Sequence, residues 1–239
     1  MKLLDSIFIL LLMILGCKKQ EVITIQAPVI TGIATTTPIS DSITYLALGD
    51  SYTIGQSVPT IQSFPYQLSA QLRLNKLTAA DPVIIARTGW TTADLKKAIT
   101  DAALTKKYSF VTLLIGVNNQ FQSVSIDSYK SDFDDLINTA VSYAGGNRKH
   151  VFVLSIPDYS VTPFALGRDT AAIRTQIDQY NAINLNESNR LGVNYLNITP
   201  ISREAKTDNT LLADDGLHPS GKMYMLWVQS LLKQVTAGL

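Results

Sequence analysis

The sequence has few of the residues that cross-link chains, bind metals or bind nucleic acids. It contains one cysteine and two histidines in 239 residues, and a single cysteine excludes an intramolecular disulfide. The 20 basic and 19 acidic residues give a net charge of +1, and no run of Lys or Arg exceeds two residues. Glycine-rich phosphate loops, H-E-x-x-H and C-x-x-C are also absent. We therefore predict no cofactor, no bound metal and no nucleic-acid partner.

Long apolar runs are also scarce, and the one at residues 7–15 is too short for the ~20 residues that span a bilayer. It suits the apolar region of an export signal. Cys17 follows at once in Ile14-Leu15-Gly16-Cys17, which resembles a bacterial lipobox, in which the cysteine is lipidated and becomes the new N-terminus. We predict a signal peptide over residues 1–16, lipidation of Cys17 and an exported protein anchored to the cell envelope, periplasmic or surface-facing. An ordinary secretory leader or an uncleaved anchor is the alternative.

Residues 17–42 are predicted to be the lipidated cysteine and a tether. This stretch is rich in Thr, Ile and Val, contains Pro28 and Pro38, and lacks helical periodicity. Residues 22–25 are β-prone and would alternatively add an edge strand. The globular domain is predicted over residues 43–239.

Within this domain, short apolar or β-branched runs alternate with amphipathic helical patterns. The predicted strands are 43–48, 82–86, 110–115, 151–155 and 193–198, and the predicted helices are 64–75, 91–103, 126–144, 169–191 and 220–236. Such alternation is typical of a parallel sheet covered by helices on both faces. The predicted fold class is a three-layer α/β/α arrangement with a five-stranded, mostly parallel, flavodoxin-like sheet.

A serine follows the first predicted strand, in Gly49-Asp50-Ser51. Ligands of open α/β sheets bind at the carboxyl ends of the strands, so the hydroxyl of Ser51 is placed where a nucleophile would meet a substrate. Serine is a weak nucleophile without a base. By itself, the motif equally fits a strand-ending turn in which Asp50 or Ser51 caps the next element.

The two histidines make the search for a base short. His150 precedes a predicted strand, which puts it at the amino edge of the sheet, and we expect it to be solvated. His218 lies in a turn-rich segment before the last helix. Asp215, three residues earlier, is close enough to accept the Nδ1 proton of His218 and leave Nε2 as a base. Asp214 is the other candidate, and without Ser51 the segment would fit a polar turn whose proline begins a helix.

Taken together, Gly49-Asp50-Ser51 and Asp215-Gly216-Leu217-His218-Pro219-Ser220 resemble the SGNH (GDSL) hydrolase family. The family's glycine after the second strand corresponds to Gly89, and its asparagine after the third strand corresponds to Asn118. The four blocks occur in the family's order and span nearly the whole domain. The sequence departs from the family's pattern at Asn119, where the family commonly has aspartate.

The resemblance implies a serine esterase with the triad Ser51, Asp215 and His218. Ser51 would attack an ester carbonyl to form an acyl-enzyme, while the N–H groups of Ser51 and Gly89 and the amide of Asn118 would hold the oxyanion. The implied substrates are acyl or acetyl esters of sugars, glycans, lipids or small alcohols.

The segment 155–164 follows the fourth predicted strand and contains Ile156-Pro157-Asp158, which resembles the family's I-P-D segment. We predict that it forms a pocket wall that includes Asp158, with Tyr52, Trp90 and Phe64 as apolar surfaces. An ordinary surface loop with core aromatics fits equally well. Asp132, Asp134 and Asp135 lie in the first half of a predicted helix, and we interpret them as a solvated face rather than a metal site.

Two other functions stay open beside hydrolysis. One is a lysophospholipase or acyltransferase, in which an alcohol can take up the acyl group instead of water. The other is a non-catalytic ligand-binding lipoprotein that has the same fold but no enzymatic activity. The sequence favours an enzyme because every member of the triad is present. Specificity within the family lies in variable loops, so the four blocks do not select one ester.

Overall fold

The computed structural model describes residues 42–239. The predicted signal peptide, Cys17, the tether up to residue 41 and the alternative strand at 22–25 lie outside the described residues. Five strands form one sheet in the order β2-β1-β3-β4-β5. They are β1 (Tyr45–Gly49), β2 (Val83–Ala86), β3 (Phe110–Leu114), β4 (Val151–Leu154) and β5 (Asn194–Leu196). Every pair is parallel, which confirms the predicted fold class.

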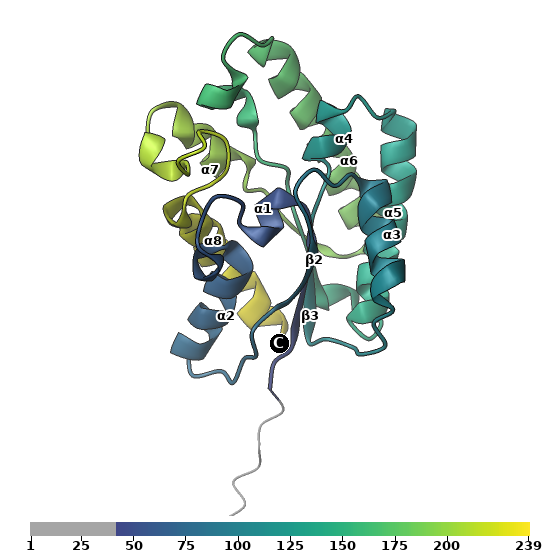
Figure 1. Cartoon of the computed structure of the whole chain (residues 1–239). Coiled ribbons are helices and arrows are strands. Elements are labelled where there is room, and N and C mark those ends of the chain that lie inside the picture. Colours follow the sequence, from purple (N-terminus) through teal and green to yellow (C-terminus); the bar gives the residue numbers. More distant parts are fainter. Residues whose placement is uncertain (1–41) are drawn as a thin grey trace, which may run out of the picture. The chain divides into compact units, whose positions relative to one another are not determined.

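Helices cover both faces of this sheet (Figure 1). They are α1 (Ser51–Ile54), α2 (Phe64–Leu74), α3 (Thr92–Ala102), α4 (Val117–Phe121), α5 (Ile126–Tyr143), α6 (Thr170–Leu191), α7 (Thr199–Arg203) and α8 (Gly221–Gly238). Helices α2 and α8 pack together on one face, and α3, α5 and α6 cover the other. Among these described helices, none is both long and apolar enough to cross a membrane.

The five predicted strands and the five long helices are all present, with ends within two residues of the predicted ones. Their boundaries follow from local chemistry. Helix α3 begins at a capping box, in which Thr91 and Asp94 satisfy each other's backbone N–H groups. Helix α6 ends at Gly192, whose φ of 70° favours glycine. The short helices α1, α4 and α7 were not predicted, because one turn is too short for a periodic pattern.

The chain order places a reversal at β1. The chain passes from β1 to β2 on one side and then crosses to β3 on the other side of β1. All residues of β1 and β3 are buried because these strands lie inside the sheet. Open α/β sheets bind ligands at the carboxyl ends of strands where the order reverses. The loops after β1 and β3 are therefore the expected place for a site.

Candidate active site

Ser51 is the first residue of α1, and only Asp50 separates it from β1. Asp50 caps this helix by accepting the backbone N–H of Tyr52 at 3.0 Å. Gly49 allows the tight passage from strand to helix, because a Cβ there would lie 2.1 Å from Oγ1 of Thr53 and 2.3 Å from the carbonyl oxygen of Leu114. The sequence thus holds the Ser51 hydroxyl at the carboxyl edge of the sheet.

His218 connects Ser51 to Asp215. Its Nε2 lies 3.0 Å from Oγ of Ser51, and its Nδ1 lies 2.6 Å from Oδ2 of Asp215. The other carboxylate oxygen of Asp215 accepts the backbone N–H groups of Leu217 at 3.0 Å and His218 at 2.9 Å. Asp215, and not Asp214, therefore faces the imidazole, and it also shapes the turn that carries it.

The environment of Asp215 favours its charged form. Burial alone would raise the pKa of this carboxyl, but hydrogen bonds from Ser57, His218 and the backbone outweigh it and lower the pKa to about 2. The group is ionised at neutral pH. A carboxylate at this distance stabilises a positive charge on His218, as a general base requires when it takes a proton.

Gly89 and Asn118 lie on the loops after β2 and β3. Gly89 has a φ of 84°, and a Cβ added there would meet nothing within 4 Å, so the backbone is open to an approaching molecule. The amide nitrogen of Asn118 donates to the carbonyl oxygen of Trp90 at 3.0 Å and keeps a second hydrogen. Gln122, for which the sequence carries no motif, holds the Gly89 peptide by donating to its carbonyl oxygen at 3.1 Å.

These residues meet at one cavity of about 130 Å³. Ser51, Gly89, Asn118 and His218 all line it. The remaining wall is mainly apolar and consists of Tyr52, Thr88, Val117, Phe121, Tyr159, Phe164 and Leu217. The cavity can hold part of a small organic molecule, with its apolar part against the side chains and its polar part against the backbone.

Three aromatic rings form most of the apolar wall. The ring centroids of Phe121, Tyr159 and Phe164 lie 6.2 to 6.3 Å apart. Tyr159 and Phe164 belong to the segment predicted as a pocket wall, and Tyr52 was predicted individually. Phe121 was not predicted, although its place shortly after β3 is a signal that would have found it.

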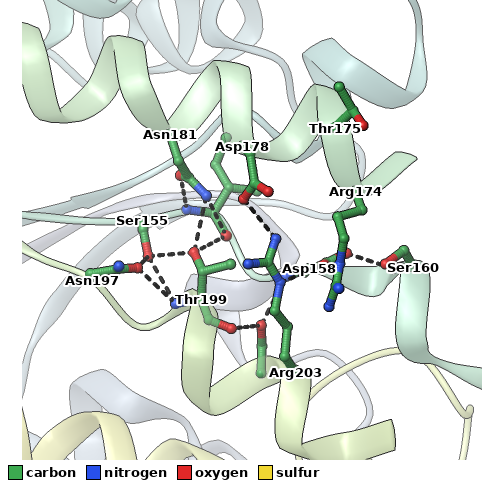
Figure 2. Close-up of polar contacts among 12 residues, drawn as sticks. Ser155, Asp158, Ser160, Arg174, Thr175, Asp178, Asn181, Asn197, Thr199 and Arg203 are labelled. Carbon is green, nitrogen blue, oxygen red and sulfur yellow. Dashed lines mark hydrogen bonds and ion pairs between the residues drawn. The ribbon is translucent and has the colours of Figure 1, made fainter. Parts of the chain in front are cut away.

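Asp158 does not line this cavity, in contrast to the prediction. It is 1% exposed, and its carboxylate accepts from Nε of Arg203 at 2.7 Å and Nε of Arg174 at 3.3 Å (Figure 2). A buried carboxylate requires such partners. Asp158 therefore ties the loop after β4 to α6 and α7.

Phe64 and Trp90 were also predicted to form apolar surfaces of the pocket, but neither lines the cavity. Phe64 is fully buried and packs against Tyr224 and Trp227, with ring centroids 6.3 Å apart, because it is the first residue of α2 and faces α8. Trp90 contributes its carbonyl oxygen to Asn118 rather than its ring to the cavity.

Asn119, the position that departs from the family pattern, is 1% exposed and forms hydrogen bonds through both its oxygen and its amide nitrogen. Its side-chain oxygen accepts the backbone N–H of Thr92 at 3.0 Å, and its amide donates to the Thr92 hydroxyl at 2.8 Å. That hydroxyl donates in turn to Asp132 at 3.1 Å. The asparagine thus joins α4 to the start of α3 next to Asn118.

Asp50 is a buried carboxyl directly before Ser51. One of its oxygens caps α1, and the other has no hydrogen-bond partner among the described residues. Burial raises the pKa of Asp50 to about 7, against the opposing effect of the Tyr52 backbone hydrogen bond. A neutral carboxyl is the less costly form in such surroundings.

The other charged groups singled out in the sequence lie away from the cavity. His150 precedes β4 and is half-buried, with Nε2 2.9 Å from the carbonyl oxygen of Gly238. Asp132 and Asp135 pair with Lys96 at 2.8 and 2.6 Å. Within residues 42–239, no group of three or more His, Cys, Asp or Glu side chains is placed to hold a metal ion.

Comparison with known proteins gives a family and several similar folds. Residues 47–226 match the model of the GDSL-like lipase/acylhydrolase family. The acetylxylan esterase Axe2 from Geobacillus stearothermophilus is 18% identical with a TM-score of 0.64, over 81% of this chain and 94% of that one. A putative lipolytic protein of the G-D-S-L family from Desulfitobacterium hafniense DCB-2 is 16% identical with a TM-score of 0.64, over 81% and 99%.

A third similar structure is the psychrotrophic esterase EstA from Pseudoalteromonas sp., which is 14% identical with a TM-score of 0.59, over 81% of this chain and 97% of that one. At these identities the likeness is one of fold. The comparison with curated proteins finds no match.

Proposed function

Because the chain belongs to the GDSL-like lipase/acylhydrolase family and is thus a carboxylic ester hydrolase, we propose that it acts as a serine esterase with Ser51 as its nucleophile. One observation carries the proposal. Nε2 of His218 lies 3.0 Å from the Ser51 hydroxyl, while Nδ1 of the same ring lies 2.6 Å from an ionised Asp215. This is the arrangement in which a base removes the proton of a serine.

The reaction begins when Ser51 Oγ attacks the ester carbonyl carbon and its proton passes to Nε2 of His218. The carbonyl electrons move to the oxygen, and the backbone N–H groups of Ser51 and Gly89 and the second amide hydrogen of Asn118 donate to this oxyanion. The intermediate collapses as His218 returns the proton to the departing alkoxide, which leaves an acyl group on Ser51. Water, deprotonated by His218, then releases the carboxylic acid by the same steps.

The apolar walls support a substrate with an apolar group next to the ester. Phe121, Tyr159 and Phe164 offer ring faces and edges on one side of the cavity, and Leu217 lies beside His218. Among the family's ester classes, we propose esters with a short to medium acyl or alkyl group on a sugar, lipid or small alcohol. The acetylxylan esterase of similar fold makes acetylated sugars one class to include in a screen.

We also propose that the protein is exported and anchored through lipidated Cys17. The support is the sequence alone, in which an apolar run leads directly into a lipobox-like segment. Metabolic labelling with a tagged fatty acid, in cells that make the wild type or Cys17→Ala, tests this. Label in the wild type alone is expected, and equal label in both variants contradicts the proposal.

The enzymatic proposal is tested by fluorophosphonate labelling and p-nitrophenyl ester turnover of the purified protein. Wild type is compared with Ser51→Ala and His218→Ala. Both variants are expected to lose labelling and turnover while keeping the circular dichroism spectrum of the wild type. A folded wild type that neither labels nor turns over ester contradicts the proposal and favours a non-catalytic binding protein.

A further inference from the structure

Ser57 contacts the same carboxylate oxygen that faces His218. It lies in the turn after α1, and its hydroxyl donates to Oδ2 of Asp215 at 2.6 Å. The same oxygen is 2.6 Å from Nδ1 of His218. The two residues are 158 positions apart in the chain, so this contact joins the turn behind Ser51 directly to the loop that carries its base.

The backbone of Ser57 is unusual. Its φ is 66°, in the left-handed region that residues with a Cβ seldom occupy. Such a conformation persists only where the surroundings hold it, and it occurs often at functional sites. The turn is held by backbone hydrogen bonds from Gln56 to Ser51 at 3.0 Å and from Val58 to Gly55 at 3.3 Å. These bonds present the Ser57 hydroxyl toward Asp215.

The neighbouring residue makes a second contact across the site. Oε1 of Gln56 accepts the hydroxyl hydrogen of Thr88 at 2.7 Å, and Thr88 lines the cavity next to Gly89. Residues 56 and 57, which we call the brace turn, therefore contact the loop of Gly89 on one side and the loop of His218 on the other.

We propose that Ser57 is a positioning residue that holds the Asp215 carboxylate against His218, and that Gln56 does the same for the Gly89 loop. The inference rests on the proposed serine esterase function and adds residues outside its triad. Without Ser57, Oδ2 of Asp215 loses one of its two side-chain donors, and the carboxylate is freer to rotate about the backbone contacts of its other oxygen. His218 then spends less time aligned with Ser51.

The expected effect is moderate because the Asp215 side chain is 31% exposed, so water replaces part of the lost hydrogen bond. We expect kcat to fall about three- to tenfold in Ser57→Gly, with KM within a factor of about two, in line with the loss of one hydrogen bond to a charged group. Glycine also relaxes the left-handed backbone, so the melting temperature is expected to stay or rise. A role in folding alone would move stability rather than kcat.

The matched control is Ser123→Gly. Ser123 has a φ of 55° and follows α4, so this variant makes the same backbone change without touching Asp215. Its kcat is expected to equal that of the wild type. In an Asp215→Asn background, Ser57→Gly is expected to change kcat by less than about twofold, since the group on which Ser57 acts is already altered.

A spectroscopic measurement distinguishes the effect of Ser57 on Asp215 from the effect of Gln56 on the Gly89 loop. The proton between Nδ1 of His218 and Asp215 gives a low-field proton resonance, which is simple to assign in a chain with two histidines. Ser57→Gly is expected to shift or broaden it. Gln56→Ala is expected to lower kcat about twofold and leave this resonance in place.

These experiments distinguish a failure of the proposed esterase function from a failure of the positioning role of Ser57. An inactive wild type, or an active Ser51→Ala, overturns the proposed function. If the wild type is active and depends on Ser51, but Ser57→Gly keeps the wild-type kcat and resonance, the positioning role alone is wrong. A fall of equal size in Ser123→Gly, or a full additional fall on top of Asp215→Asn, also overturns it.

Discussion

Asn119 and Thr92 hold each other through two hydrogen bonds, one to the Thr92 backbone N–H at 3.0 Å and one to its hydroxyl at 2.8 Å. The amide of Asn119 occupies an acceptor position of that hydroxyl, which leaves its hydrogen free to reach Asp132 at 3.1 Å. An aspartate at position 119 would compete with Asp132 for the hydroxyl hydrogen of Thr92. The neutral side chain is therefore matched to the charge on Asp132.

Replacing Asn119 by Asp is expected to make stability fall as pH rises. Burial and the nearby Asp132 would raise the pKa of the new carboxyl above its value in the unfolded chain, so the loss is small near pH 4 and grows toward neutral pH. We expect about 1 to 3 kcal/mol at pH 8, measured by urea unfolding. Asn209→Asp on the surface is the control. A variant as stable as the wild type at pH 8 would show that Asp132 does not require a neutral neighbour.

Removing the amide of Asn118 is expected to slow catalysis without unfolding the protein. One oxyanion donor contributes a factor of ~10² to 10³ in kcat. Asn118→Ala should therefore lose turnover of p-nitrophenyl acetate by about this factor while its melting temperature stays close to that of the wild type. Unchanged turnover would remove Asn118 from the oxyanion site.

Asp50 is expected to make the folded state less stable as pH rises from about 4 to about 7. Its pKa is raised from 3.8 to about 7 in the folded state, so over this range the unfolded chain releases a proton that the folded chain keeps. At about 1.4 kcal/mol per pKa unit, the loss is on the order of 4 kcal/mol. It is complete above pH 7 and absent well below pH 4.

The measurement is the free energy of unfolding of the wild type and Asp50→Asn at several pH values between 4 and 8. The variant is expected to lose this slope, whatever its stability at one pH. Asp101→Asn on the exposed surface of α3 is the control. Parallel profiles for wild type and Asp50→Asn would contradict the assignment of the slope to this carboxyl.

The aromatic wall is expected to set the acyl-chain preference. Each buried methylene contributes about 0.8 kcal/mol, or roughly a fourfold rise in kcat/KM, as long as the added carbons contact the wall. Phe164→Ala and Phe121→Ala should flatten the rise from acetate to hexanoate p-nitrophenyl esters, with acetate least affected. Leu166→Ala, at an exposed residue outside the lining, is the control. A chain-length profile unchanged in both phenylalanine variants would place the acyl group elsewhere.

Arg203 is expected to matter for stability and not for chemistry. It donates to buried Asp158 at 2.7 Å, and removing one partner of a buried ion pair leaves an uncompensated charge. Arg203→Met should cost about 3 kcal/mol of unfolding free energy, since Arg174 remains as a weaker partner. The kcat of the folded enzyme should stay near that of the wild type. A large fall in kcat with little loss of stability would instead support the predicted role of Asp158 in the substrate pocket.

Much of the fold was predictable because its signals are local. Short apolar or β-branched runs mark all five strands, of which β1, β3 and β4 are completely buried, and the helix limits follow from caps such as Thr91 and Gly192. The short helix α4 escaped prediction because five residues are too few to show a helical periodicity in the sequence.

The order of the four blocks and the resemblance it supports come from the sequence by itself, as do the residue types at Ser51, Gly89, Asn118, Asp215 and His218. Only the tertiary structure decided which side chains face the cavity. Asp158 and Phe64 turn into the interior, while Phe121 and Ser57 meet partners far along the chain. The reason is physical: a strand or a cap depends on a few adjacent residues, whereas the direction of a loop side chain depends on packing and charge supplied by segments that are distant in sequence.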